Sequence, residues 1–267
     1  MGALGEITTV VIPTYNEAEN IEPLVRQLLA LPLNLRIVVV DDNSPDGTGD
    51  ILDRLAAEDS RLNPIHRPGK LGLGTAYIAG FKRAMETGAL LVISMDADFS
   101  HDPRHIPDML KKMRECDLVI GSRYVRGGGT RHCTLPHKFL SWGANSFAKM
   151  VLGLRARDCT AGFRCYRREV LERVGLDQIF SNGYSFLVEM LYCTERLGYR
   201  VGEVPIVFEN RQRGASKISR REIAKALYTV MRLRFRRLPW ERWAAQYRGR
   251  HKQDFTAESA ATVENSE

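Results

Sequence analysis

LRIVVVDDNSPDG, residues 35–47, decides the fold class of this chain. Its first half is a continuous run of aliphatic and β-branched residues, and its second half is a polar cluster rich in turn formers. A strand that is apolar at every position, and not only at alternate ones, is typical of a parallel sheet covered on both faces. The segment therefore predicts a buried strand at 35–40 that ends in a polar loop.

The flanking sequence extends this pattern into alternating strands and helices. Apolar runs predict further strands at 7–12, 62–66, 89–95 and from 118 onwards, and apolar residues at helical spacing predict helices at 18–31, 48–58, 74–87 and 107–115. Strands that alternate with helices are typical of an α/β fold with a mostly parallel, Rossmann-like sheet.

Composition places the chain among folded proteins of the cell interior. It has 267 residues, of which 44% are hydrophobic and 27% charged. The longest apolar run, residues 89–95, is far shorter than the roughly 20 residues of a membrane-spanning helix. The start of the chain lacks the basic stretch and cleavage site of a signal peptide. Five cysteines without a Cys-x-x-Cys pair fit reduced thiols, so we expect an intracellular protein.

Charge divides the chain into three predicted parts. Residues 1–210 are nearly neutral, residues 211–252 hold 14 Lys or Arg against two acids, and residues 253–267 hold four acids and no bases. We expect an α/β domain, a basic extension and a disordered acidic tail. The basic part fits anionic lipid, nucleic acid or a phosphorylated substrate, and a solvated basic face without a partner is the plain alternative.

The basic extension contains one amphipathic segment. Residues 218–238 place apolar side chains at helical spacing and basic side chains elsewhere on the helix; the apolar ones are Ile223, Leu227, Val230, Met231, Phe235 and Leu238. This pattern predicts a helix that lies on an anionic membrane surface. A core helix with a solvated basic side has the same periodicity and stays open.

Polar residues gather where the predicted strands end. They form the segments Pro13–Glu17, Asp41-Asp42, Asp96-Ala97-Asp98 and Gly121–Arg123. In an open parallel sheet ligands bind beyond the carboxyl ends of the strands. These four loops are therefore the predicted ligand site.

Asp96 and Asp98 suggest a metal site within it. Two residues apart on an extended chain, both carboxylates point to one side and repel each other unless a cation lies between them. Oxygen ligands suit Mg²⁺ or Mn²⁺, although a solvated turn is the plain alternative for an isolated Asp-x-Asp. No G-x-G-x-x-G, P-loop, G-x-S-x-G or His-Glu-x-x-His motif occurs, which excludes several common enzyme classes.

An ordered set of motifs resembles the dolichyl-phosphate (polyprenyl-phosphate) mannosyltransferases, which are inverting glycosyltransferases with the GT-A fold. The motifs span about residues 7–235 and are, in chain order, Val11–Glu17, Val39–Thr48, Lys70–Ala76, Met95–His101, Gly121–Gly129, Gly143–Asn145, Asp158–Arg164, Gly183-Tyr184, Glu203–Ile206 and Arg211–Lys217. Each motif alone is weak, whereas the ordered set is specific.

The resemblance implies roles for individual residues. Those that would hold the nucleotide sugar, expected to be GDP-mannose, are Pro13, Tyr15, Glu17, Val40, Asp42, Asp96, Ala97, Asp98, Arg211 and Lys217. Asp96, Asp98 and Ser100 would bind the metal; Ser100 stands where relatives often have Gln. The expected catalytic residues are Asp96, Asp98, Arg123 and Arg211.

The implied acceptor is a polyprenyl phosphate. Arg123, His137 and Lys138 would bind its phosphate, and His137 stands by spacing where the family has an arginine. Because a phosphate oxygen is already anionic near neutral pH, no strong general base is needed.

The resulting hypothesis is a metal-dependent enzyme that transfers mannose with inversion at the cytoplasmic face of the membrane, as a peripheral protein or held by a separate membrane protein. One alternative is transfer of another sugar, such as glucose from UDP-glucose. The other is a non-catalytic module that binds lipid or nucleic acid. We expect no nucleic-acid partner, because no helix-turn-helix or RNA-binding signature occurs.

Overall fold

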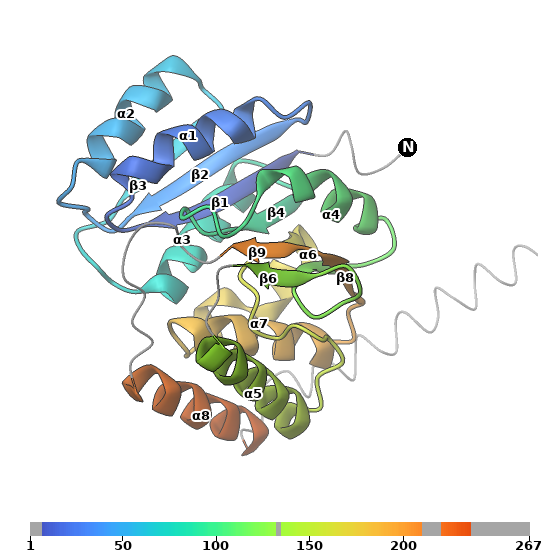
Figure 1. Cartoon of the computed structure of the whole chain (residues 1–267). Coiled ribbons are helices and arrows are strands. Elements are labelled where there is room, and N and C mark those ends of the chain that lie inside the picture. Colours follow the sequence, from blue (N-terminus) through green and yellow to red (C-terminus); the bar gives the residue numbers. More distant parts are fainter. Residues whose placement is uncertain (1–6, 132–134, 210–219, 236–267) are drawn as a thin grey trace, which may run out of the picture.

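A mixed seven-stranded sheet organises the molecule (Figure 1). The computed structural model describes residues 7–131, 135–209 and 220–235, and for residues 135–140, 184 and 220–226 it describes the backbone alone. The strand order is β3-β2-β1-β4-β7-β5-β8. These strands are β1 (Thr8–Thr14), β2 (Leu35–Asp41), β3 (Leu62–His66), β4 (Leu91–Ser94), β5 (Leu118–Ser122), β7 (Arg164–Arg167) and β8 (Val201–Pro205). Only β7 runs against its two neighbours, so the sheet is mostly parallel, as predicted.

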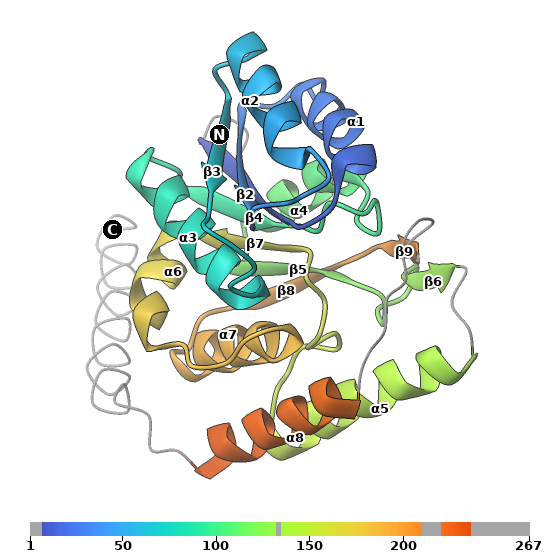
Figure 2. The ribbon, with the colours of Figure 1, turned by 90° about the vertical axis from the view of Figure 1, so that its left-hand side faces the viewer.

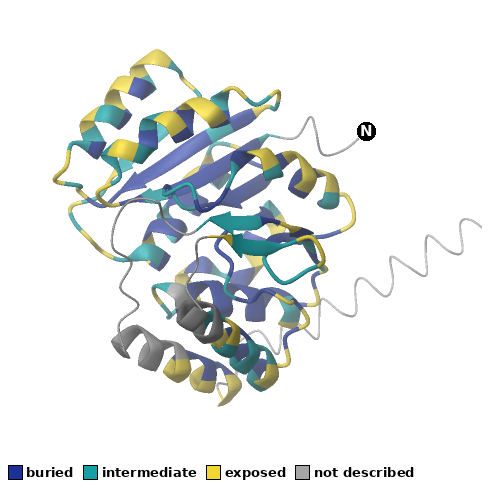
Figure 3. Ribbon diagram, viewed as in Figure 1, coloured by how far each residue is buried: buried dark blue, intermediate teal, exposed yellow. Residues whose placement is uncertain are grey.

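Helices cover both faces of the sheet, which explains why the strands are apolar throughout. One face packs against α1 (Ala18–Leu29), α2 (Thr48–Glu58) and α4 (Ile106–Lys112). The other packs against α3 (Leu73–Glu86), α6 (Arg168–Val174) and α7 (Tyr184–Arg196). Val10 and Ile12 enter the first core and Val11 enters the second, so alternate side chains of one strand serve two cores. The dark blue sheet in Figure 3 shows this double burial.

Two helices form a further layer below α7. They are α5 (Leu135–Leu152) and α8 (Arg220–Phe235), which lie side by side in both Figure 1 and Figure 2. Val230 and Leu233 of α8 are buried in the same core cluster as α7. The predicted boundary at residue 210 stays a prediction, but the first described helix after it packs against the α/β body.

A small second sheet lies beyond the carboxyl ends of β5 and β8. It pairs β6 (Gly129–Arg131) with β9 (Val207–Glu209) in parallel, and β9 directly continues the chain from β8. Two short 3₁₀ turns, η1 (Pro103–His105) and η2 (Leu176–Gln178), complete the described elements. None of the helices described in the three ranges is both long and apolar enough to cross a bilayer.

Candidate active site

The carboxyl ends of β1 and β2 bring two of the predicted polar loops together. Pro13 is paired with Val40 and Thr14 with Asp41 in the register of these strands. Beyond them, the backbone N–H groups of residues 16–18 donate to side chains of the next loop: Asn16 to Ser44 Oγ at 3.0 Å, Glu17 to Thr48 Oγ1 at 3.1 Å and Ala18 to Asp46 Oδ2 at 3.0 Å. The polar turn formers in the opening stretch of sequence therefore shape the loop that holds Tyr15 and Glu17.

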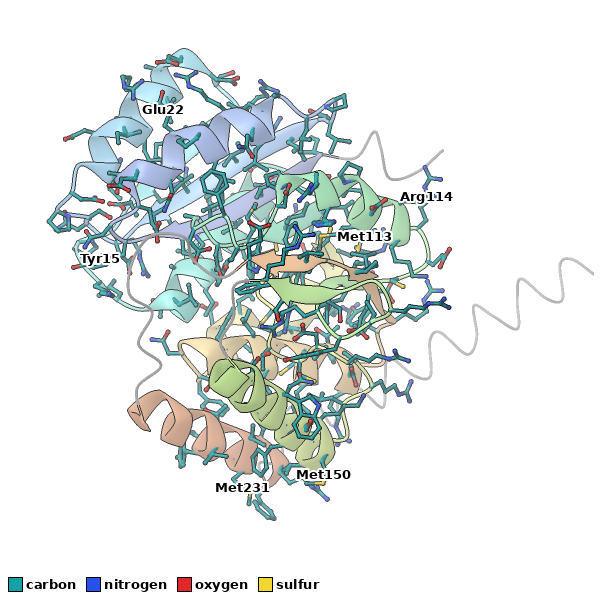
Figure 4. The ribbon with its side chains drawn as sticks, viewed as in Figure 1. Tyr15, Glu22, Met113, Arg114, Met150 and Met231 are labelled. Atoms are coloured by element: carbon teal, nitrogen blue, oxygen red, sulfur yellow. The ribbon has the colours of Figure 1, made fainter. Side chains whose placement is uncertain are left out.

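Tyr15 marks the outer side of this region (Figure 4). The residue is 36% exposed, and its ring lies under the Lys70 ammonium, with Nζ 3.9 Å from the ring centroid. Lys70 belongs to the loop between β3 and α3, so this contact joins a third loop to the site. Attraction between a cation and an aromatic face is modest at an exposed position, but it gives the flat ring a defined orientation.

Asp42 lies deeper, at the end of β2. Its side chain is 7% exposed and forms an ion pair with Arg67. Sequence reasoning selected Asp42 and missed Arg67, because a single arginine after a short strand has no distinguishing pattern. Pro13 is half-buried and Val40 is fully buried, so any contact from these two residues to a ligand is limited to a small part of their surface.

Asp96 is held by two residues from other elements. Tyr77 of α3 donates its hydroxyl to Asp96 Oδ1 at 2.9 Å. Burial, together with the charge of Asp96, raises the pKa of Tyr77 well above its ordinary value, so the phenol keeps the proton that it donates. The Asp96 N–H donates to His101 Nδ1 at 3.0 Å. Burial lowers the pKa of His101, which fits a neutral ring with its proton on Nε2. These two supports were absent from the predicted site.

The chain around Asp98 is turned, which corrects one step of the sequence argument. β4 ends at Ser94, and Phe99 has a positive φ of 59°, so the strand alternation invoked for Asp96 and Asp98 does not apply. Instead Asp98 Oδ1 accepts the Ser100 N–H at 3.1 Å. Asp98 also lines an open cleft of about 420 Å³ that lies among α1, residues 98–104 and β9.

The residues around Asp96 fit a hard cation. Ser100 is 2% exposed and its Oγ has no hydrogen-bond partner, which leaves a buried oxygen in the turn that carries Asp96 and Asp98. Among the described residues no three His, Cys, Asp or Glu side chains gather closely enough to form a protein-only metal cage. Two carboxylates and a hydroxyl suit Mg²⁺ or Mn²⁺, since such ions keep waters and bind substrate phosphates.

Arg123 is already paired. Its guanidinium donates to both carboxylate oxygens of Asp158 at 2.8 Å, and Nη2 also donates to Thr160 Oγ1 at 2.7 Å. Burial raises the pKa of Asp158, but the bonds and charge of Arg123 outweigh burial and leave that pKa below its ordinary value. The acceptor role of Arg123 stays a prediction, and its visible function here is to hold the 158–160 loop.

That loop closes the side of the site next to Asp96. Ser94 Oγ donates to the Gly162 carbonyl at 2.7 Å, and a Cβ at Gly162 would lie 3.3 Å from the His101 ring. Arg164 is fully buried and donates to the carbonyls of Ala161, Cys159 and Leu187. The glycine permits this close approach without a shift of the His101 ring, and the buried arginine fixes the loop in place.

The remaining predicted residues fall outside this description. Arg211 and Lys217 lie outside the described residues, and the side chains of His137 and Lys138 are likewise not described. Ala97 is buried next to Asp96. The structure places Tyr15 and Asp42 in the loops beyond β1 and β2, and Asp96, Asp98 and Ser100 in the turn after β4. Their roles in binding a ligand or metal stay predictions.

A sheet with this strand order, flanked by helices and with an Asp-x-Asp turn at its carboxyl edge, defines an α/β protein with a GT-A-like fold. The chain matches the sequence profile of glycosyl transferase family 2 over residues 9–175. It belongs to this family and is a glycosyltransferase.

Two relatives match most of the chain. It is 45% identical over 222 residues to an undecaprenyl-phosphate mannosyltransferase of Micrococcus luteus. This match covers 83% of this chain and 91% of that protein. It is 43% identical over 225 residues to the polyprenol monophosphomannose synthase of Mycolicibacterium smegmatis, which covers 84% and 85%.

A solved structure supports the fold. Glucosyl-3-phosphoglycerate synthase of Mycobacterium tuberculosis, in complex with Mn²⁺, UDP and glucosyl-3-phosphoglycerate, superposes with a TM-score of 0.60. The match covers 86% of this chain and 80% of that chain at 18% identity. At this identity the match establishes the shared α/β architecture only.

Proposed function

We propose that the protein transfers mannose from GDP-mannose to a polyprenyl phosphate with inversion and releases GDP. The observation behind this proposal is the identity of 43–45% to two relatives whose names specify mannosyl transfer to an undecaprenyl or polyprenol acceptor. The family resemblance noted from the motifs leads to the same reaction.

The donor is bound by the loops at the strand ends. Tyr15, Glu17 and Asp42, with Pro13 and Val40 beneath them, contact the nucleoside, and Ala97 contributes backbone next to the diphosphate. Arg211 and Lys217 act on the diphosphate. Tyr15 fits this role because its partly exposed ring is oriented by Lys70 and offers a flat face to a base.

Asp96, Asp98 and Ser100 hold a Mg²⁺ or Mn²⁺ ion. When bound, the cation supplies positive charge that stabilises the nucleoside diphosphate leaving group. Tyr77 and His101 keep Asp96 in place for this role, since one donates to its carboxylate and the other accepts its backbone N–H. Mn²⁺ is also the ion in the glucosyl-3-phosphoglycerate synthase complex.

The chemistry requires alignment more than proton transfer. A phosphate oxygen of the acceptor attacks C1 of mannose, and the bond between C1 and the diphosphate oxygen breaks on the opposite side, which inverts C1. The nucleophile is already anionic, so no side chain needs to remove a proton. Arg123, His137 and Lys138 bind the acceptor phosphate in this proposal. The loop fixed by Asp158 and Arg164 positions Arg123.

The protein reaches its lipid acceptor by binding the membrane surface with α5 and α8. Six of the large exposed apolar side chains lie on these two adjacent helices, namely Trp142, Met150, Leu227, Tyr228, Met231 and Phe235. Met150 and Met231, labelled in Figure 4, lie at the end of the molecule away from α1 and α2. Exposed Arg232 and Arg234 add positive charge. This combination suits the cytoplasmic face of an anionic membrane, with the protein bound peripherally or through a separate membrane protein.

Donor binding tests the proposal. We expect GDP to bind in the presence of Mn²⁺ with at least tenfold higher affinity than UDP, measured by isothermal titration calorimetry. A preference for UDP would replace mannose transfer with transfer of another sugar. Binding of neither nucleotide would instead favour a non-catalytic lipid-binding module.

A further inference from the structure

Three sequence motifs whose residues include several without a role in the reaction meet at one short segment, residues 157–159. The motifs are Gly143–Asn145, Asp158–Arg164 and Glu203–Ile206. They lie on α5, on the chain that leads into β7, and on β8. Their meeting point is next to Arg123, because Asp158 is the carboxylate that pairs with this arginine. The contacts made at this segment therefore bear on the position of Arg123.

Asn145 of α5 holds the segment from the helix side. Its Oδ1 accepts the Cys159 N–H at 2.7 Å, and its Nδ2 donates to the Arg157 carbonyl at 2.6 Å. Asn145 is 5% exposed and Cys159 is fully buried, so breaking these bonds leaves buried polar groups unpaired. An amide suits this position because it accepts and donates at once, whereas an aspartate could only accept.

Glu203 of β8 holds the same segment from the sheet side. Its two carboxylate oxygens accept the N–H groups of Arg157 and Asp158, at 2.9 and 3.0 Å. Glu203 and Asn145 together engage the N–H groups of residues 157, 158 and 159 and the carbonyl of residue 157. The backbone on both sides of Asp158 is thus fixed by two side chains from distant parts of the chain.

Asp158 passes this fixed position on to Arg123. Its Oδ2 accepts the Arg123 backbone N–H at 3.0 Å and Nε at 2.8 Å, and its Oδ1 accepts Nη2 at 2.8 Å. One fully buried carboxylate therefore sets both the backbone and the guanidinium of Arg123. A second link to α5 starts at the next residue, since the hydroxyl oxygens of Tyr124 and Ser141 lie 3.1 Å apart.

We infer that Asn145 and Glu203 are positioning residues that fix Arg123, through Asp158, for the phosphate of the acceptor. This inference rests on the proposed function, in which Arg123 binds that phosphate. The donors of a guanidinium form a rigid planar fork, so its contact with phosphate depends on its orientation. Because α5 also carries the exposed Trp142, the helix that meets the lipid is the helix that orients the arginine for its phosphate.

Kinetics with polyprenyl phosphate in vesicles test the inference in Asn145→Ala and Glu203→Gln. The acceptor KM should rise about tenfold or more in both variants, because Arg123 is no longer held in one orientation. The donor KM, and the affinity for GDP with Mn²⁺ measured by calorimetry, should stay unchanged. Asn145→Ser should give a smaller rise, since its hydroxyl can form one of the two bonds.

The donor site should be unaffected because the loop has a separate anchor next to it. Arg164 donates to the carbonyls of Cys159 and Ala161, and these bonds are present in every variant. The part of the loop that lies next to Asp96 therefore keeps its place.

Hydrogen exchange reports the position of Arg123 without any substrate. The Arg123 N–H is bonded to Asp158, so a peptide that contains residues 121–124 should exchange faster in Asn145→Ala and Glu203→Gln than in the wild type. Mass spectrometry of peptic fragments measures this rate.

Glu195→Gln is the matched control for Glu203→Gln. Glu195 of α7 accepts the N–H groups of Arg155 and Ala156, directly before the segment, through the same kind of bond. This variant also removes one carboxylate from the loop, but it leaves both anchors beside Asp158 in place. The acceptor KM and the exchange of residues 121–124 should therefore stay at their wild-type values.

The outcomes separate the inference from the proposed function. An unchanged acceptor KM or unchanged exchange in folded Asn145→Ala and Glu203→Gln would overturn the inference; if Asn145→Ala does not fold, Asn145→Ser and Glu203→Gln decide. Equal rises of the donor and acceptor KM would also overturn it, since general loosening of the fold predicts them. A wild type that transfers no mannose to polyprenyl phosphate would contradict the proposed function, whereas the exchange rates would still decide whether Asn145 and Glu203 fix Arg123.

Discussion

Loss of the Asp98 carboxylate is expected to affect activity and not stability, because of where this residue lies. It is half-buried in a turn at the edge of the sheet, where its Oδ1 accepts the N–H of the nearby Ser100. Asp98→Ala should therefore abolish metal-dependent turnover and change the melting temperature little. Activity titrations with Mn²⁺ and thermal unfolding measure the two effects. Asp108→Ala, at an exposed acid of α4, is the control and should retain full activity; turnover retained by Asp98→Ala would contradict the metal role.

Asp158 should make the stability of the protein depend on pH. Its pKa in the folded state lies below the ordinary value of 3.8, so its pairing with Arg123 stabilises the fold at pH values above about 4. This stabilisation is lost as pH falls through the lower, folded-state pKa. Asp158→Asn should reduce the free energy of unfolding at pH 7 by about 3 kcal/mol, because Arg123 loses the charge of its partner.

Urea denaturation at a series of pH values from 7 to 2 checks this prediction. The difference between wild type and Asp158→Asn should shrink as the pH approaches 2. A difference that is independent of pH would show that the carboxylate is not stabilised by its partner.

Single residues were predictable where a pattern marked them. Asp96 and Asp98 could be selected because they are two acids that follow a buried strand. Tyr15 and Asp42 could be selected because they follow two other predicted strands. Tyr77 and His101, which support Asp96, were not selected, since a tyrosine within a helix and a lone histidine are usually part of the core. Their role depends on α3 and the 98–101 turn both reaching Asp96, which no local pattern specifies.

At the level of elements, α8 has two apolar faces that its periodicity alone did not separate. Val230 and Leu233 are buried against the body, whereas Leu227, Met231 and Phe235 are exposed at a spacing of four residues. The single apolar stripe predicted from the sequence thus includes residues with opposite roles. Burial of α8 depends on α5 and α7, which lie far away in the sequence.

The outer face of α5 and α8 should bind anionic vesicles. Exchange of both Met150 and Phe235 for Glu should lower vesicle binding about tenfold or more, because two acids face a negative surface and apolar contact is lost. GDP affinity and melting temperature should stay unchanged, since both side chains are more than 75% exposed. Flotation with vesicles that contain anionic lipid measures binding. Leu90→Glu, at an exposed leucine before β4, is the control. Equal vesicle binding by the double variant would refute this membrane face.

For the whole molecule, the alternation of strands and helices was sufficient to predict a mostly parallel α/β sheet. It did not predict that β7 runs antiparallel between β4 and β5, because Arg164–Arg167 is short and lies after a long helix. The β6–β9 sheet was likewise missed. Its two strands have only three residues each, which is too short for a recognisable strand pattern. They pair because the chain segments that follow β5 and β8 lie side by side.

The central claim is that this fold transfers mannose to a lipid phosphate with the help of a metal ion. The most direct measurement incubates the purified protein with vesicles that contain polyprenyl phosphate, Mg²⁺ or Mn²⁺, and either GDP-mannose or UDP-glucose, and identifies lipid products by mass spectrometry. The account predicts a polyprenyl phosphomannose from GDP-mannose that disappears when a chelator is added. A glucolipid formed from UDP-glucose without any mannolipid from GDP-mannose, or a mannolipid that forms equally well with the chelator present, would contradict it.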